Sequence, residues 1–112
     1  MKEGDVVIVA MPQADGGVKN RPVILLREMP PFRDALVCGV SSQLRHEVVD
    51  FDEIVSPEDP DFASSGLVTA SLIRLGFISV VPRSKIAGSI GSIGSFRHRR
   101  LLERLSDYLI AY

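Results

Sequence analysis

The sequence is poor in several residue types, and each shortage excludes a class of protein. The single cysteine, Cys38, has no partner for an internal disulfide, and the Cys and His residues form no cluster of the metal-binding type. There is no tryptophan, and the net charge is only −1, so any nucleic acid must be bound by a local basic patch. We therefore expect neither a disulfide-stabilised nor a metal-stabilised domain.

The chain also lacks long apolar runs. Its longest apolar segments are far too short to span a bilayer. Lys2, Glu3 and Asp5 interrupt the apolar stretch that a signal peptide would need. We expect a soluble, cytoplasmic protein with no membrane partner. The length of 112 residues gives room for one domain, over residues 1–112.

The residues that are present suffice for a folded core. Hydrophobic residues make up 46% of the sequence, which excludes disorder as the main state. Cys38 lies in the apolar run 35–38, which favours a buried packing residue over a nucleophile. Runs rich in β-branched residues predict strands. Residues 6–10 are such a run. The apolar runs 22–26 and 35–40 predict two more strands, the roughly alternating segment 48–54 predicts a half-exposed strand, and residues 86–93 predict a short strand and turn.

Segment 67–81 allows two interpretations. Its β-branched residues indicate strand, and the interior Gly76 predicts two pieces with a bend between them, but residues 67–72 can instead form a short helical turn. Stretches containing Pro, Gly, Asp and Ser predict loops. These stretches are residues 12–20, 30–31 and 56–65.

The clearest helix is at the end of the chain. Ser95 is the predicted N-cap. An apolar stripe at helical spacing follows it. Its members are Leu101, Leu102, Leu105, Leu109 and Tyr112. We therefore expect a mainly β fold with a C-terminal helix, built as a small, strongly bent antiparallel sheet or barrel that the helix closes.

One cation near the start has a position suited to an anion. Residues 4–9 read GDVVIV, a polar loop follows, and residues 21–26 then read RPVILL. Arg21 thus stands where a mobile loop meets the second strand. A guanidinium stays charged and offers a planar fork of donors, so it can be aimed at a phosphate. A salt bridge or a loop anchor before Pro22 is the alternative.

Several strings, taken in order, resemble the PemK/MazF family of toxins. They are GDVV at residues 4–7, RPVIL at 21–25, VSSQ at 40–43, GLV at 66–68 and IR at 73–74. The resemblance implies an SH3-like (CcdB/MazF-type) small antiparallel barrel with added helices, usually dimeric. It also implies a sequence-specific endoribonuclease that needs no metal or cofactor and is neutralised by a cognate antitoxin.

The same resemblance assigns roles to individual residues. Arg21 matches the catalytic arginine, and Ser41 matches a hydroxyl residue that is more often Thr. Ser42, Gln43 and Arg74 match further polar positions of the RNA site. Ser71 departs from the pattern, because many members carry an acidic residue there.

RNA can be cut without a metal because its own 2′-OH serves as the nucleophile. An enzyme must then remove a proton, stabilise an anionic phosphorane and protonate the leaving oxygen. Arg21 is the candidate for charge stabilisation and Ser41 for hydrogen-bond donation. His46 is a further candidate because histidine suits acid–base work; a solvated residue beside a strand is the alternative. Lys19, Arg45 and Arg74 extend the basic surface toward single-stranded RNA.

Three features leave alternatives open. The run RHRR at residues 97–100 opposes the helix dipole, so either it binds a phosphate or an acidic partner, or it is a solvated face. Phe32 or Phe62, both in predicted loops, can stack on RNA bases or belong to the core. The missing acid at Ser71 favours a non-catalytic module of the same fold, such as a protein that binds and poisons DNA gyrase. An SH3-like adaptor would need more aromatic residues than this chain has.

Overall fold

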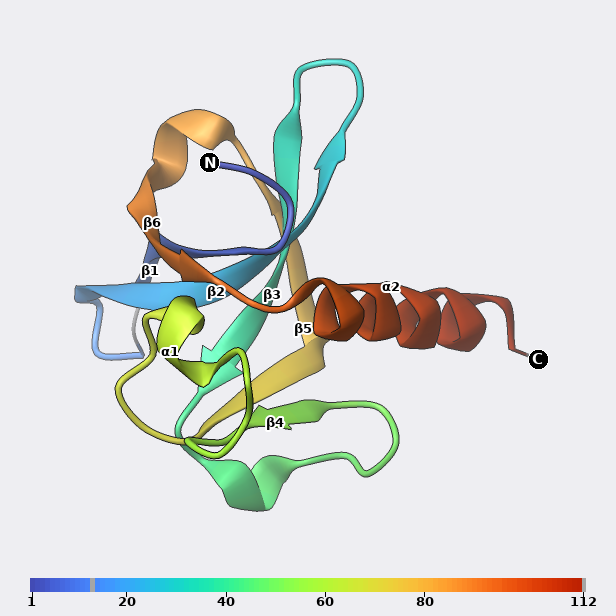
Figure 1. Ribbon diagram of the computed structural model, residues 1–112. Helices are drawn as coiled ribbons and strands as arrows, with labels where there is room; N and C mark the ends of the chain where they lie inside the picture. The colour runs from blue at the N-terminus through green and yellow to red at the C-terminus, as the bar shows by residue number, and fades with distance from the viewer. Residues whose placement is uncertain (13, 112) are drawn as a thin grey trace.

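The computed structural model describes residues 1–12 and 14–111. Its six strands form one antiparallel sheet in the order β4-β5-β3-β2-β1-β6 (Figure 1). No described helix is long and apolar enough to cross a membrane. The elements are β1 (Asp5–Pro12), β2 (Val18–Met29), β3 (Asp34–Ser41), η1 (Leu44–His46), β4 (Glu53–Val55), α1 (Phe62–Ser65), β5 (Ser71–Val81), η2 (Arg83–Lys85), β6 (Ile86–Ser92) and α2 (Ser95–Ile110).

The predicted class, mainly β with a C-terminal helix, is confirmed. Four of the five predicted strands lie within β1, β2, β3 and β6, apart from the last residue of the run 86–93. The sheet bends strongly (Figure 1), but its outer strands β4 and β6 form no ladder with each other in the described part of the chain. It is therefore an open sheet and not the closed barrel that was the other expectation.

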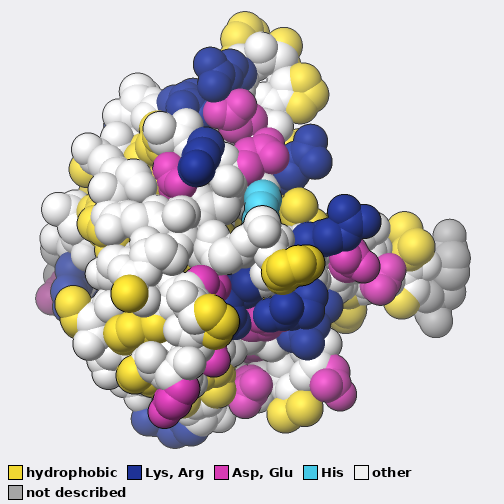
Figure 2. All heavy atoms as spheres, in the orientation of Figure 1, with side chains coloured by type: hydrophobic (Ala, Val, Ile, Leu, Met, Phe, Trp, Pro, Cys, Tyr) yellow, Lys and Arg dark blue, Asp and Glu magenta, His cyan; other side chains and the backbone are white. Residues whose placement is uncertain are grey.

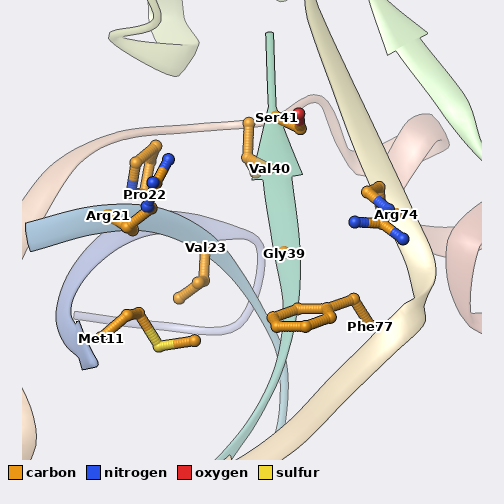
Figure 3. A pocket seen from close by; sticks show the side chains of 9 residues that line it. All are labelled: Met11, Arg21, Pro22, Val23, Gly39, Val40, Ser41, Arg74 and Phe77. Atoms are coloured by element: carbon orange, nitrogen blue, oxygen red, sulfur yellow. The ribbon is translucent and has the colours of Figure 1, made fainter. Parts of the chain in front are cut away.

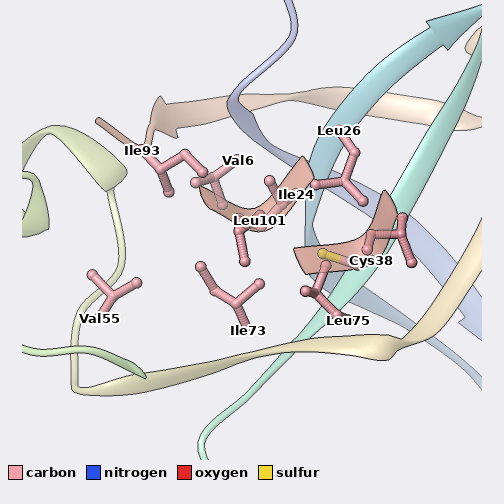
Figure 4. Close-up of a cluster of buried hydrophobic side chains, with 10 residues drawn as sticks. Val6, Ile24, Leu26, Cys38, Val55, Ile73, Leu75, Ile93 and Leu101 are labelled. Atoms are coloured by element: carbon pink, nitrogen blue, oxygen red, sulfur yellow. The ribbon is translucent and has the colours of Figure 1, made fainter. Parts of the chain in front are cut away.

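The sheet separates two apolar clusters. Val6, Ile24 and Leu26 point to the side that α2 covers, where Leu101 packs against them (Figure 4). Alternate residues of the same strands form the second cluster on the opposite side. This explains why β2 carries four consecutive buried residues, as its unbroken apolar run predicted.

Cys38 belongs to the first cluster. It is 0% exposed, and burial raises the pKa of its thiol to about 12. The thiol therefore stays protonated at neutral pH, and the prediction of a packing residue is confirmed.

Two predicted segments, the loop after β1 and the strand around β4, have the wrong boundaries. The predicted loop 12–20 is shorter, because β2 starts at Val18 and its first residues pair with β1. The predicted strand 48–54 shrinks to β4. The reason is Asp52, whose carboxylate accepts hydrogen bonds from the Val48 and Leu75 amides at 2.9 and 3.0 Å and holds residues 48–52 in a turn.

Segment 67–81 contains one strand with an interrupted ladder. Arg74 pairs with Gly39, but the next pair along β5 joins Ile78 to Cys38. The irregularity surrounds Gly76, where the sequence predicted a bend. The alternative helical turn at residues 67–72 is wrong, since the helical turn is α1, inside the predicted loop 56–65.

The helix α2 begins at Ser95, so its N-cap is Gly94 and not the predicted Ser95. Leu101 and Leu105 are buried as expected, but Leu109 is 66% exposed because the end of α2 projects from the sheet (Figure 1). Tyr112, the last member of the predicted stripe, lies outside the described residues.

The basic run at the start of α2 is solvated only in part: Arg99 is exposed, but Arg97 is only 8% exposed. All five of its N–H donors are used: they reach Asp61 twice, Glu53, Asp59 and the Ile54 carbonyl, at 2.8–3.2 Å. The acidic partner that the run was predicted to need is therefore supplied by the chain itself.

Glu53 is the second centre of this cluster. Its buried carboxylate accepts hydrogen bonds from Arg97 and Arg100 and lies 3.5 Å from Arg104. These arginines are three or four residues apart, so they share one face of α2. Figure 2 shows basic and acidic side chains gathered along the first turns of the helix. The cluster ties α2 to β4 and to the segment before α1. His98 is also engaged, and not simply exposed, because its Nε2 lies 2.8 Å from the Leu26 carbonyl oxygen.

We expect the protein to lose stability in acid through this cluster. The hydrogen bond from Arg97 lowers the pKa of Asp61 below its usual 3.8 and outweighs the opposing effect of burial. A lowered pKa stabilises the folded state above the unfolded value, and that contribution disappears as the pH falls through the folded value. Thermal unfolding followed by circular dichroism should therefore show Tm falling below about pH 4. Asp61→Asn should have a lower Tm at neutral pH and a shallower fall; an equally steep fall would contradict this.

Candidate functional site

One pocket on the sheet brings together three of the residues that the sequence singled out. It has a volume of about 210 Å³. Arg21 comes from β2, Ser41 from β3 and Arg74 from β5. The full lining is Met11, Arg21, Pro22, Val23, Gly39, Val40, Ser41, Arg74 and Phe77. Figure 3 shows Arg21 and Arg74 on opposite sides of β3, with Ser41 toward one end and Phe77 and Met11 toward the other.

Strand register explains the hollow. Val23 pairs with Gly39, and Gly39 pairs with Arg74, so the three residues form a row across β2, β3 and β5. The middle member has no side chain, and the Phe77 ring lies against it instead. This part of the pocket wall lies between an apolar residue on one side and a cation on the other.

The two cations give the pocket its electrostatic character. Arg21 is exposed and Arg74 is half-buried, and none of the lining residues, all within the described part of the chain, is acidic. Two positive charges beside one hollow favour a bound anion. The Arg74 guanidinium carbon also lies 5.6 Å from the centre of the Phe77 ring, which is a cation–π contact. The pocket can therefore take a phosphate next to a flat apolar group.

The hydroxyl of Ser41 takes part in a local turn. The backbone N–H of Gln43 donates to Ser41 Oγ at 3.0 Å. A hydroxyl that accepts such a bond still carries its own proton. Ser41 at the end of β3 can therefore donate that proton in a hydrogen bond to a phosphate oxygen.

The other predicted site residues do not line the pocket. Lys19 is exposed on β2, two residues before Arg21 and so on the same side of the strand. Ser42 and Gln43 are exposed beyond the end of β3. Arg45 Nη1 donates to Gln43 Oε1, and His46 is exposed at the end of η1. Four of these residues thus follow Ser41 closely in the chain and the fifth lies two residues before Arg21; we call these five the border residues.

Ser71 contributes no group to the pocket. The residue is 5% exposed, and its hydroxyl donates to the Thr69 carbonyl at 2.8 Å. Residue 71, where the resemblance led us to look for an acid, thus carries a small buried hydroxyl.

Sequence reasoning missed the aromatic residue of the site. Phe32 lies in the turn between β2 and β3 and is 81% exposed, whereas Phe62 lies in α1 and packs against the core. Neither lines the pocket, and Phe77 does. The available signal was a pair of isolated glycines within strand patterns, Gly39 and Gly76, since such glycines mark bulges or close approaches.

Comparisons with known proteins identify the fold. No protein-family model matches the chain, and no curated protein matches it. Among solved structures, the Mycobacterium tuberculosis toxin MazF-mt6 has a similar fold, with a TM-score of 0.68 and 19% sequence identity. The match covers 96% of this chain and 99% of that one. At this low identity the likeness establishes a shared fold: the chain has a MazF-like fold along nearly its whole length.

Proposed function

We propose that this protein is a toxin endoribonuclease of the PemK/MazF type, which cuts single-stranded RNA at specific sequences without a metal. The observation that carries the proposal is the pocket lined by Arg21, Ser41 and Arg74. Three strands contribute these side chains, and the pocket offers two cations and a hydroxyl to an anion. The MazF-like fold supports the same conclusion.

The reaction uses the 2′-OH of the RNA. Its oxygen attacks the adjacent phosphorus, the bond from phosphorus to the 5′ oxygen breaks, and the products are a 2′,3′-cyclic phosphate and a 5′-hydroxyl. Arg21 and Arg74 stabilise the charge that develops on the phosphorane, and Ser41 donates a hydrogen bond to a non-bridging oxygen. His46, beyond the end of β3, is the proposed acid–base group.

The border residues bind the RNA on either side of the cut. Lys19 and Arg45 neutralise neighbouring phosphates, and Ser42 and Gln43 offer hydrogen bonds to sugar or base edges. The gene product acts as a homodimer in the cytoplasm, cuts mRNA and is neutralised by a cognate antitoxin protein. These properties are those of PemK/MazF toxins, and the fold is the observation that supports them.

The direct test is to incubate the purified protein with a long RNA in the presence of EDTA. We expect discrete fragments that end in cyclic phosphates, because neither Arg21 nor Ser41 needs a metal for its role. RNA that stays intact at high concentrations of folded protein would contradict the proposal.

One observation favours a second candidate, a non-catalytic toxin that binds a protein such as DNA gyrase. No acid lines the pocket in the described part of the chain, and Ser71 is buried. This candidate predicts intact RNA together with inhibition of DNA supercoiling by purified gyrase. The endoribonuclease predicts the opposite result in both assays.

A further inference from the structure

We propose that one unpaired RNA base stacks on Phe77, next to the phosphate that Arg21 and Ser41 bind. This inference rests on the proposed function and adds a base-binding subsite to it. Three features of the structure support this proposal. The interrupted ladder of β5 and the glycine beneath the ring bring Phe77 to the pocket, and the exposure of the ring leaves it accessible to a base.

The interrupted ladder turns Phe77 toward the pocket. Side chains alternate along a regular strand, so residues three apart, such as Arg74 and Phe77, would point to opposite faces. In β5, however, Arg74 pairs with Gly39 and Ile78 pairs with the preceding residue of β3, so three residues of β5 lie between the pairs. Such a bulge re-aims side chains. Arg74 and Phe77 accordingly share one side, with the guanidinium carbon 5.6 Å from the ring centre.

Gly39 gives the ring its place. A Cβ atom built on Gly39 would lie 2.8 Å from Cδ1 of Phe77, which is closer than Cβ atoms approach non-bonded atoms in proteins. Any other residue at this position would push the ring away. The absent side chain thus lets the Phe77 ring lie against β3 and line the pocket (Figure 3).

The ring is only partly covered by the protein. Phe77 is 48% exposed even though it lines the pocket. The pocket volume of about 210 Å³ is below the roughly 300–1,000 Å³ of sites for drug-sized ligands, so the pocket suits one flat group and not a whole oligonucleotide. Proteins that bind single-stranded RNA stack unpaired bases on aromatic rings and on guanidinium planes. Phe77 and Arg74, which contact each other, together offer such a surface in the pocket that Arg21 also lines.

The test measures binding of a short single-stranded RNA pool in which every 2′-OH is methylated, so that the RNA cannot be cut. Fluorescence anisotropy gives the affinity of the wild type, Phe77→Leu and Phe77→Tyr. Stacking contributes about 1–3 kcal/mol per base, so Phe77→Leu should weaken binding by about 5- to 150-fold. Phe77→Tyr keeps the ring and should bind within about twofold of the wild type. Phe96→Leu is the matched control, because Phe96 is 82% exposed on α2 and does not line the pocket.

A second variant tests the role of Gly39. Gly39→Ala should weaken binding because its methyl group displaces the ring, and adding it to Phe77→Leu should cause little further loss. If the fold-losses in affinity of Gly39→Ala and Phe77→Leu instead multiply in the double variant, Gly39 does not act through Phe77. Thermal unfolding of each variant separates a lost contact from a lost fold.

The outcomes distinguish this subsite from the proposed function. If the wild type cuts RNA but Phe77→Leu binds the methylated pool as tightly as the wild type, the subsite is wrong and the endoribonuclease stands. If Phe77→Leu weakens binding but the wild type leaves unmodified RNA intact, the subsite stands and catalysis is wrong. A wild type that neither binds nor cuts overturns both.

Discussion

Arg21→Ala should lower the rate of RNA cleavage by about 10³-fold or more while Tm stays within a few degrees of the wild-type value. Arg21 lines the pocket and is exposed, so its removal takes a charge from the site without opening the core. A cation that meets charge developing in the transition state contributes mainly to kcat. Cleavage of a fluorescent oligonucleotide under saturating conditions gives the required rate.

Arg27→Ala is the matched control for this experiment. Arg27 lies on the same strand, its side chain is 57% exposed, and it pairs with Glu3 at 3.3 Å, but it does not line the pocket. Its replacement should leave kcat and KM unchanged. Undiminished cleavage by folded Arg21→Ala would refute the role of Arg21, and an equal loss in both variants would mean that general surface charge drives the reaction.

Arg97→Met should lower the free energy of unfolding by about 3–5 kcal/mol, because removal of one partner leaves buried acids without their counter-charge. Arg97 is 8% exposed and uses all five donors, and its partners Glu53 and Asp61 are also largely shielded. Such a loss is a large fraction of the roughly 5–15 kcal/mol that stabilises a typical domain. Urea unfolding followed by circular dichroism measures it.

A neighbouring arginine on α2 provides the comparison. Arg99 pairs with Glu103 one turn later at 3.0 Å, but both side chains are well exposed, at 80% and 61%. Arg99→Met should therefore cost no more than about 0.5 kcal/mol. Similar losses in the two variants would show that burial does not determine the strength of the Arg97 cluster.

The strands that the sequence predicted well are those whose own residues decide the conformation. Residues 6–10, 22–26 and 35–40 are apolar runs that contain β-branched residues, so local preference and burial favour the same structure. The segment 48–54 also contains β-branched residues, but the Asp52 carboxylate competes with the ladder for backbone amides. That competition involves Leu75, which is distant in sequence, and no local pattern reports it.

The residues of the candidate site also fall into two groups: those that the sequence could predict and those that it could not. Arg21, Ser41 and Arg74 stand at recognisable positions in ordered strings, so the sequence could nominate them, and the fold places all three around one pocket. The place of Phe77 depends on a bulge and on a glycine from another strand. Likewise, the basic run on α2 suggested an anion site, but its partners come from residues 53–61. Contacts between distant segments decide such features.

The central claim is that this pocket cuts RNA through the RNA's own 2′-OH. The most direct measurement compares two oligonucleotides in EDTA after the cut site has been mapped: one is all RNA, and the other carries a single 2′-deoxy nucleotide immediately before the cut. Wild-type protein should cut the first to a cyclic phosphate and a 5′-hydroxyl and leave the second intact at that position. Cleavage of the 2′-deoxy oligonucleotide at the same bond would contradict the account.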